Sequence, residues 1–109
     1  MKKAYEQIKE IMLEADYGVN TSLNMTLHLS KLIEEVGEMA QSMNKLNGRK
    51  KRSDTEPYEE ILENIREEAA DSIQCLMAIA INAGVDYESL KKTLEEKNKK
   101  FKDSIQKKK

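Results

Sequence analysis

Apolar residues between positions 23 and 46 recur alternately every four and every three residues, and this spacing constrains the fold more than any other feature of the chain. The series is Met25, Leu29, Leu32, Val36, Met39, Met43 and Leu46. Alternating steps of four and three are typical of an α-helix that packs along its whole length against other helices. We therefore expect this segment to be one long helix of a helical bundle.

Breaks in the apolar pattern divide the rest of the chain into further helices. Helices are expected at residues 3–15, 23–46, 58–83 and from 86 or 87 to about 105. Gly48 and Gly84 stand where the second and third helices end, and glycine readily takes the left-handed conformation found at helix C-termini. Residues 49–57 form a polar loop that contains four consecutive basic residues, 49–52. We expect one all-α domain over residues 1–109, folded as an antiparallel four-helix bundle.

The composition excludes several classes of protein. Charged residues make up 36% of the 109 residues but nearly cancel, at a net charge of −1, so no nucleic-acid partner is expected. The longest apolar run, 75–81, is too short to span a bilayer, so no membrane partner is expected either. A single cysteine, Cys75, excludes an intrachain disulfide and suits a reducing compartment. These features predict a cytoplasmic protein.

The second half of the third expected helix is apolar almost all round. From residue 73 to 83 the only clearly polar side chains are those of Gln74 and Asn82. A helix of this kind is buried on more than one side. Because a chain this short has little core of its own, we expect a second copy to supply the additional cover. The prediction is a homo-oligomer, either a dimer or a dimer-of-dimers tetramer, that assembles through the third helix.

Two acidic motifs with the same spacing carry the chemistry of the chain. They read Glu34-Glu35-x-x-Glu38 and Glu67-Glu68-x-x-Asp71. Within each motif, acids three residues apart share a helix face. Glu68 also falls on the apolar seam of its helix, which is traced by Ile61, Ile65, Ser72, Leu76, Ile79 and Ala83. A buried, unpaired carboxylate is costly, so Glu68 should be neutral, paired with a cation or bound to a metal.

Antiparallel packing of the second and third helices would point four carboxylates into one gap. These are the side chains of Glu35, Glu38, Glu68 and Asp71, with Glu34 at the edge. Oxygen ligands without paired histidine or cysteine suit a hard cation such as Mg²⁺, with Mn²⁺ as a substitute. The alternative is that each acidic pair lies on a solvated helix face, where such pairs are common. The matching spacing of the two motifs favours the metal site.

Three single residues also bear on the site. His28 lies two turns before Glu35 on nearly the same face and either contacts a ligand or is structural. Cys75 lies in the apolar part of its helix and is expected in the core. Gly37 lies inside a helix, where glycine costs up to about 1 kcal/mol relative to alanine. Either a close approach of a helix or ligand explains this glycine, or it is simply tolerated.

The acidic motifs resemble those of a known superfamily. Residues 31–40, with the sequence KLIEEVGEMA, and residues 67–71, EEAAD, are similar to the MazG-like all-α nucleoside triphosphate pyrophosphohydrolases. This superfamily includes dimeric dUTPases and phosphoribosyl-ATP pyrophosphohydrolase. Its signature is Glu-x-x-Glu followed by Glu-x-x-Asp. Residues 80–86 resemble the family's turn into the last helix, and 98–101 resemble its Asn-x-Lys-Phe segment.

The resemblance implies Mg²⁺-dependent hydrolysis of (d)NTPs between the α and β phosphates, which yields (d)NMP and pyrophosphate. In that case Glu35, Glu38, Glu68 and Asp71 hold the metal, and Glu34 or Glu35 orients or deprotonates the attacking water. The expected substrate-binding residues are Lys31, Lys97, Asn98 and Lys100.

The chain departs from the family pattern at one place. Family members often carry an arginine after the Asn-x-Lys-Phe segment, and this chain has Lys102-Asp103-Ser104 there instead. Phosphate contacts from the last helix would then fall to Lys97, Lys100 or Lys102. Two alternatives remain open: phosphoribosyl-ATP hydrolysis, and a non-catalytic helical module for oligomerisation or adaptor binding.

Overall fold

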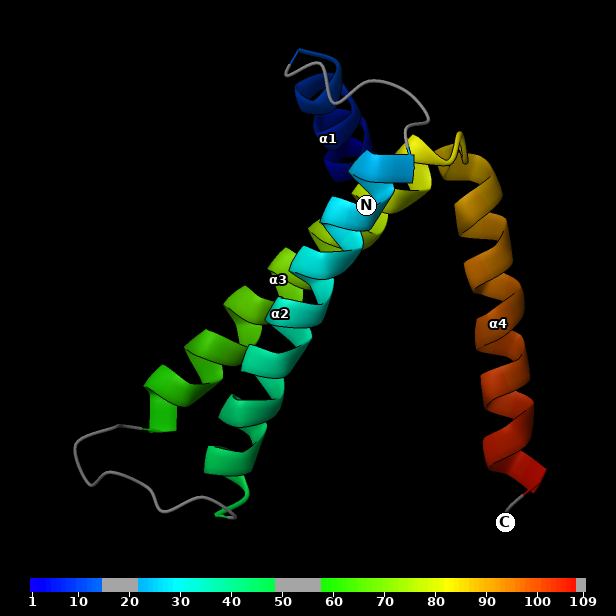
Figure 1. Cartoon of the computed structure of the whole chain (residues 1–109). Coiled ribbons are helices and arrows are strands. Elements are labelled where there is room, and N and C mark those ends of the chain that lie inside the picture. Colours follow the sequence, from blue (N-terminus) through cyan, green and yellow to red (C-terminus); the bar gives the residue numbers. More distant parts are fainter. Residues whose placement is uncertain (15–21, 49–57, 108–109) are drawn as a thin grey trace.

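The computed structural model describes residues 1–14, 22–48 and 58–107. This part of the chain contains four α-helices and no strand, as Figure 1 shows. The helices are α1 (Lys2–Glu14), α2 (Ser22–Leu46), α3 (Tyr58–Asn82) and α4 (Tyr87–Lys107). The all-helical fold is confirmed, with bounds within about two residues of those expected. The basic loop of residues 49–57 lies outside the described residues.

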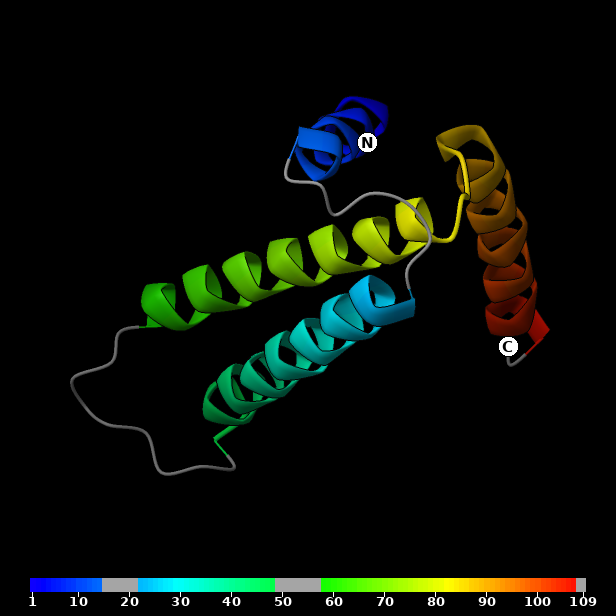
Figure 2. The same cartoon turned by 45° about the horizontal axis from the view of Figure 1, so that its top comes forward.

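Helices α2 and α3 form a hairpin in which the two helices lie side by side and run in opposite directions (Figures 1 and 2). Its register follows from a hydrogen bond that Ser42 Oγ donates to Glu68 Oε1 over 3.0 Å. All α-helices have the same rise per residue, so moving forward along α2 by a number of residues reaches the same level as moving back along α3 by that number. This register places Glu35 level with Cys75.

The seam of the hairpin follows residues seven apart, or about two helical turns. On α2 these are His28, Glu35 and Ser42, and on α3 they are Ile61, Glu68, Cys75 and Asn82. The seam therefore differs from the expected apolar one. Leu29, Val36 and Met43 were expected in the contact but are each 48% exposed. Helix α3 covers only one edge of the apolar stripe of α2, where Leu32 and Met39 are partly buried.

Helix α1 packs against α3 and supplies much of the core. Tyr5 and Met12 of α1 are 1% and 6% exposed, and Met77 and Ala78 of α3 are buried as well. A second surface that covers α3 thus comes from α1 of the same chain. The sequence analysis had predicted that a second copy of the chain would supply this cover. Leu76 remains 53% exposed, so this cover is incomplete.

The turn between α3 and α4 is closed by local hydrogen bonds. Gly84 has a φ of +80°, and the amide of Val85 donates to the carbonyl of Ala80 over 2.9 Å. Asp86 Oδ1 accepts a hydrogen bond from the amide of Ser89 at 2.7 Å and so caps the N-terminus of α4. Gly48, at the end of α2, also has a positive φ of 74°, so both glycines take the expected left-handed conformation.

Side chains of α1 hold this turn from outside. The hydroxyl of Tyr5 donates a hydrogen bond to the carbonyl of Val85. The Tyr5 ring also contacts the ring of Tyr87, with 5.7 Å between their centroids, and Lys2 Nζ lies 3.5 Å from a Glu88 carboxylate oxygen. The direction of α4 is therefore set by contacts with α1. We call these contacts the elbow clamp.

Helix α4 extends away from the hairpin (Figures 1 and 2), and none of its residues is buried. The radius of gyration is 17.1 Å, whereas a compact chain of this length has a radius of about 13 Å. The four helices of the described chain are thus not closed into a bundle within one molecule.

The elbow clamp predicts a stability difference between two tyrosines. Tyr5→Phe removes the donor to the Val85 carbonyl, and we expect it to lower the free energy of unfolding by about 1–2 kcal/mol. Tyr58→Phe is the matched control, because Tyr58 is 52% exposed, and it should change stability by less than about 0.5 kcal/mol. Urea denaturation of both variants measures the difference. Equal effects would contradict the role assigned to Tyr5.

Candidate functional site

The side chain of Glu35 is the centre of the candidate site. Glu35 is 4% exposed and lies on the seam between α2 and α3. The ammonium of Lys31, one turn earlier, lies 3.0 Å from Glu35 Oε1 and 3.9 Å from Glu34 Oε1. A buried carboxylate needs such a partner. The hydrogen bond to Glu35 and the neighbouring carboxylates raise the pKa of Lys31.

Carboxylates from both helices gather on one flank of the hairpin. The pKa of Glu38 is raised, mainly by the charge of Glu35, then by partial desolvation, and by the charges of Glu34 and Glu68. Burial raises the pKa of the Cys75 thiol, with further contributions from Glu35 and Asp71. Counted at about 100° per residue from the seam, Glu34, Glu38 and Asp71 lie to the same side of the antiparallel hairpin. We call Glu34, Glu35, Glu38, Glu68 and Asp71 the acidic flank.

The carboxylates of the acidic flank do not converge on a common point. Among residues 1–14, 22–48 and 58–107, no three Asp, Glu, His or Cys side chains lie close enough to hold a metal ion together. Glu35 is paired with Lys31, Glu68 accepts from Ser42, and Asp71 is exposed. The structure therefore brings the four expected ligands to one flank without bringing them to ligand distance. Their donor set, oxygen only, is of the kind that Mg²⁺ binds.

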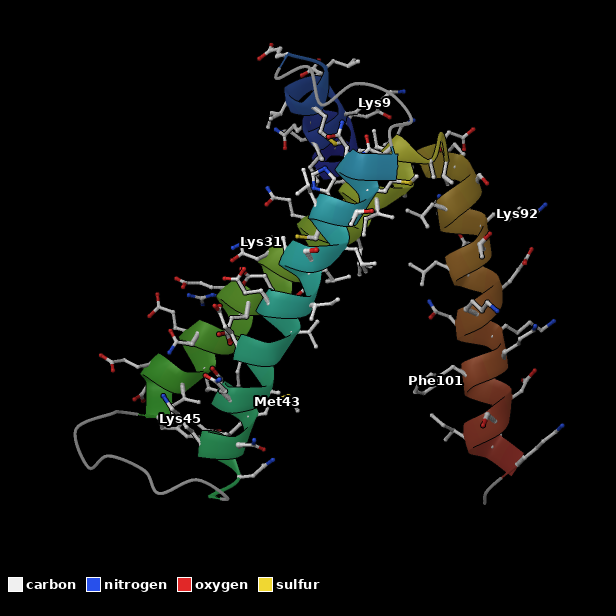
Figure 3. All side chains as sticks on the ribbon, viewed as in Figure 1. Lys9, Lys31, Met43, Lys45, Lys92 and Phe101 are labelled. Carbon is white, nitrogen blue, oxygen red and sulfur yellow. The ribbon has the colours of Figure 1, made fainter. Side chains whose placement is uncertain are left out.

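The most deeply buried acid is not the one expected. The apolar seam suggested Glu68, but Glu68 is only half-buried, and Glu35 is the buried carboxylate. Glu35 lies on the seam at the level of Cys75, and Lys31 reaches it from one turn earlier on the same helix. Lys31 lies on the side of α2 away from α4 in Figure 3.

A cavity of about 270 Å³ opens beside the acidic flank, between α1, α2 and α3. It is lined by Ile8, Ile11, Met12, His28, Lys31, Gln74, Cys75 and Ala78. Mostly apolar walls with a few polar groups are typical of small-molecule sites, and this volume is slightly smaller than the usual range of about 300–1,000 Å³. Lys31 both lines the cavity and contacts Glu35, so it joins the two. Cys75 is buried, as expected.

Two buried polar residues were missed by the sequence analysis. Ser42 is 7% exposed and holds Glu68. Asn82 is 1% exposed, and neither polar atom of its side chain has a hydrogen-bond partner within the described chain. Steps of seven residues from Glu35 and from Glu68 lead to these two positions. That periodicity was the signal that could have found them.

Other expected site residues lie elsewhere. Lys97, Asn98 and Lys100 are exposed on α4, which the structure does not bring to the acids of the same chain. A Cβ atom at Gly37 would meet nothing within 4 Å, so no close approach within the described chain explains this glycine.

Comparison of the chain with protein-family models, with curated proteins and with solved structures gives no match. None of the helices in the described ranges combines the length and the apolar character needed to cross a bilayer.

The raised pKa of Glu38 predicts a pH-dependent stability change. At a pH above the raised pKa of Glu38, repulsion between the Glu38 and Glu35 carboxylates lowers the stability of the folded protein. At a pH low enough to protonate Glu38 in both the folded and the unfolded protein, this repulsion is absent. Glu38→Gln should therefore raise the thermal midpoint at pH 7, and the gain should vanish near about pH 3. The control is Glu96→Gln in the exposed α4. Thermal unfolding between these pH values tests this, and a gain that does not depend on pH would contradict it.

Proposed function

We propose that this chain is an Mg²⁺-dependent nucleotide pyrophosphohydrolase, which cleaves (d)NTPs between the α and β phosphates. The observation that carries the proposal is the acidic flank: carboxylates of two separate helices lie on one side of the hairpin, beside a cavity. The choice of reaction comes from the similarity of the two acidic motifs to the MazG-like enzymes. In this proposal the active form of the enzyme is a homo-oligomer.

Glu35, Glu38, Glu68 and Asp71 are the proposed metal-binding residues. Bound there, Mg²⁺ would neutralise charge on the substrate phosphates. Lys31 now neutralises Glu35 at 3.0 Å. A substrate phosphate beside Lys31 would compete for its ammonium, and Glu35 would then be available to another cation. Substrate and metal binding are coupled in this proposal.

The reaction proceeds by attack of a water oxygen on the α phosphorus. The bond from this phosphorus to the bridging oxygen breaks, and pyrophosphate leaves with the bonding electrons. The proton of the attacking water passes to Glu34 or Glu35. The Glu34 side chain is 60% exposed and that of Glu35 only 5%, so Glu34 is the more accessible to water. The cavity would hold the nucleobase of the substrate, with His28 and Gln74 as polar groups in its wall.

A non-catalytic oligomerisation or adaptor module is the second candidate function. It is favoured by the Lys31–Glu35 pair, which satisfies the buried acid without a metal, and by the many exposed apolar side chains. Such a module would show no hydrolysis of nucleotides and no Mg²⁺-dependent increase in thermal stability.

The main proposal is tested with single-turnover assays over a panel of NTPs and dNTPs in Mg²⁺. We expect at least one nucleotide to give equal amounts of monophosphate and pyrophosphate. Release of orthophosphate, or no hydrolysis of any nucleotide, would contradict the proposal.

Two adjacent acids provide a matched test of the site. Glu68→Gln keeps an oxygen that Ser42 can reach but removes the charge, and we expect turnover to fall by about 10²–10³-fold. Glu67→Gln removes the same charge from an exposed neighbour and should leave turnover within about threefold of the original. Similar losses in both variants would show that the site does not depend on the position of Glu68.

A further inference from the structure

Asn82, the last residue of α3, has a buried side chain whose hydrogen-bonding groups are not used within the described chain. It is 1% exposed, and neither the oxygen nor the nitrogen of its carboxamide has a hydrogen-bond partner there. Asparagine often bonds a neighbouring backbone group, but Asn82 does not. Unpaired buried donors and acceptors lower stability and are rare in native proteins. The carboxamide can therefore bind a ligand without giving up a contact within the described chain.

The Asn82 side chain lies next to the cavity between α1, α2 and α3. Counted at about 100° per residue, it projects from α3 between the directions of Cys75 and Ala78, which both line the cavity. Side chains on an α-helix lean toward its N-terminus, so that of Asn82 leans over the turn of Ala78. In the register of the hairpin, Asn82 lies level with His28, another lining residue. Asn82 is thus at one end of the cavity, one turn beyond the small side chain of Ala78.

The rest of the cavity suits a flat apolar ring with a charged group beyond it. Apolar side chains from α1 and α3 form much of the wall, namely those of Ile8, Ile11, Met12 and Ala78. Lys31, also a lining residue, pairs with Glu35, whose level on the hairpin is seven residues, or about 10 Å, from that of Asn82. A nucleoside is about this long. A base edge at Asn82 therefore leaves the phosphates of a nucleotide beside Lys31 and the acidic flank.

The carboxamide has the chemistry that a base edge needs. It presents an acceptor oxygen and a donor nitrogen side by side. Nucleobases also carry a donor and an acceptor side by side on their edges, and asparagine can form two parallel hydrogen bonds with such an edge. A half-turn of the carboxamide exchanges the positions of its donor and acceptor. An apolar cavity that ends in a carboxamide thus matches a nucleobase both in its faces and in its edge.

We propose that Asn82 binds the base of the substrate, through paired hydrogen bonds between its carboxamide and the edge of a nucleobase in the cavity. The ring lies against the apolar wall formed by α1 and α3, and the ribose extends toward Lys31. The choice of a nucleobase as the ligand rests on the proposed function. A ligand that leaves the buried carboxamide unpaired binds less tightly, so Asn82 contributes to specificity.

NMR of the ¹⁵N-labelled full chain, titrated separately with uridine, cytidine, adenosine and guanosine, tests this contact. Nucleosides carry no phosphate, so the titration requires neither metal nor hydrolysis. The carboxamide signals of Asn82 are identified by their absence from the spectrum of Asn82→Leu or Asn82→Ala. We expect at least one nucleoside to shift these signals. No shift with any of the four, or shifts confined to the amides of Gln74 and Ala78, would overturn the proposal.

Variants measure what the contact contributes to affinity. Asn82→Leu should raise the dissociation constant of the bound nucleoside by at least about tenfold, because two hydrogen bonds are lost. Asn82→Ala removes the same bonds and serves if the leucine side chain does not fit. Asn64→Leu makes the matching change at an exposed position of α3 and should leave the dissociation constant within about twofold of the original. Unchanged affinity in the Asn82 variants would overturn the proposal.

The result is separate from that of the hydrolysis assays. Nucleoside binding through Asn82, without hydrolysis of any nucleotide, would contradict the proposed enzyme and support the base contact. Hydrolysis of a nucleotide, without a shift of the Asn82 signals by any nucleoside, would support the enzyme and overturn the base contact.

Discussion

The hydrogen bond between Ser42 and Glu68 is the interaction on which the arrangement of the hairpin depends, because it joins α2 to α3 and sets their register. Two turns away, Glu35 lies at the centre of the same contact and is 4% exposed. Its partner Lys31 lies one turn earlier on α2 with a side chain that is 55% exposed, and this pairing offsets the cost of burying the Glu35 carboxylate. Around this seam, the helical repeat sends the other acids to one flank and the exposed apolar residues to the other.

The two flanks of the hairpin differ in chemical character. The acidic flank adjoins the cavity that α1 closes, and it carries the proposed chemistry. On the other flank, the apolar side chains of Leu29, Val36, Met43, Leu62 and Leu76 are 41–53% exposed, and α4 extends away from them with no buried residue of its own. A radius of gyration of 17.1 Å, for a chain that would measure about 13 Å if compact, has the same origin.

The sequence predicted the local structure well and the contacts less well. Apolar spacing and the glycines at 48 and 84 gave four helices nearly at their observed bounds, because these signals act within a few residues. The seam was misplaced, since its centre is polar and a search for apolar residues selects Val36 before Glu35. The position of α4 depends on Tyr5, eighty residues from Val85, and no local pattern encodes that contact. The acidic motifs predicted which residues share a flank, but not that Lys31 would occupy the centre of it.

The most direct test of the central claim is a titration of the ¹⁵N-labelled protein with Mn²⁺, followed by NMR. A paramagnetic ion broadens the signals of residues near it. We expect the amide signals around Glu35, Glu38, Glu68 and Asp71 to lose intensity together and before any others, at sub-stoichiometric Mn²⁺, and we expect added Mg²⁺ to restore them. Broadening spread evenly over exposed acids such as Glu59 and Glu95, or confined to only one of the two motifs, would contradict it.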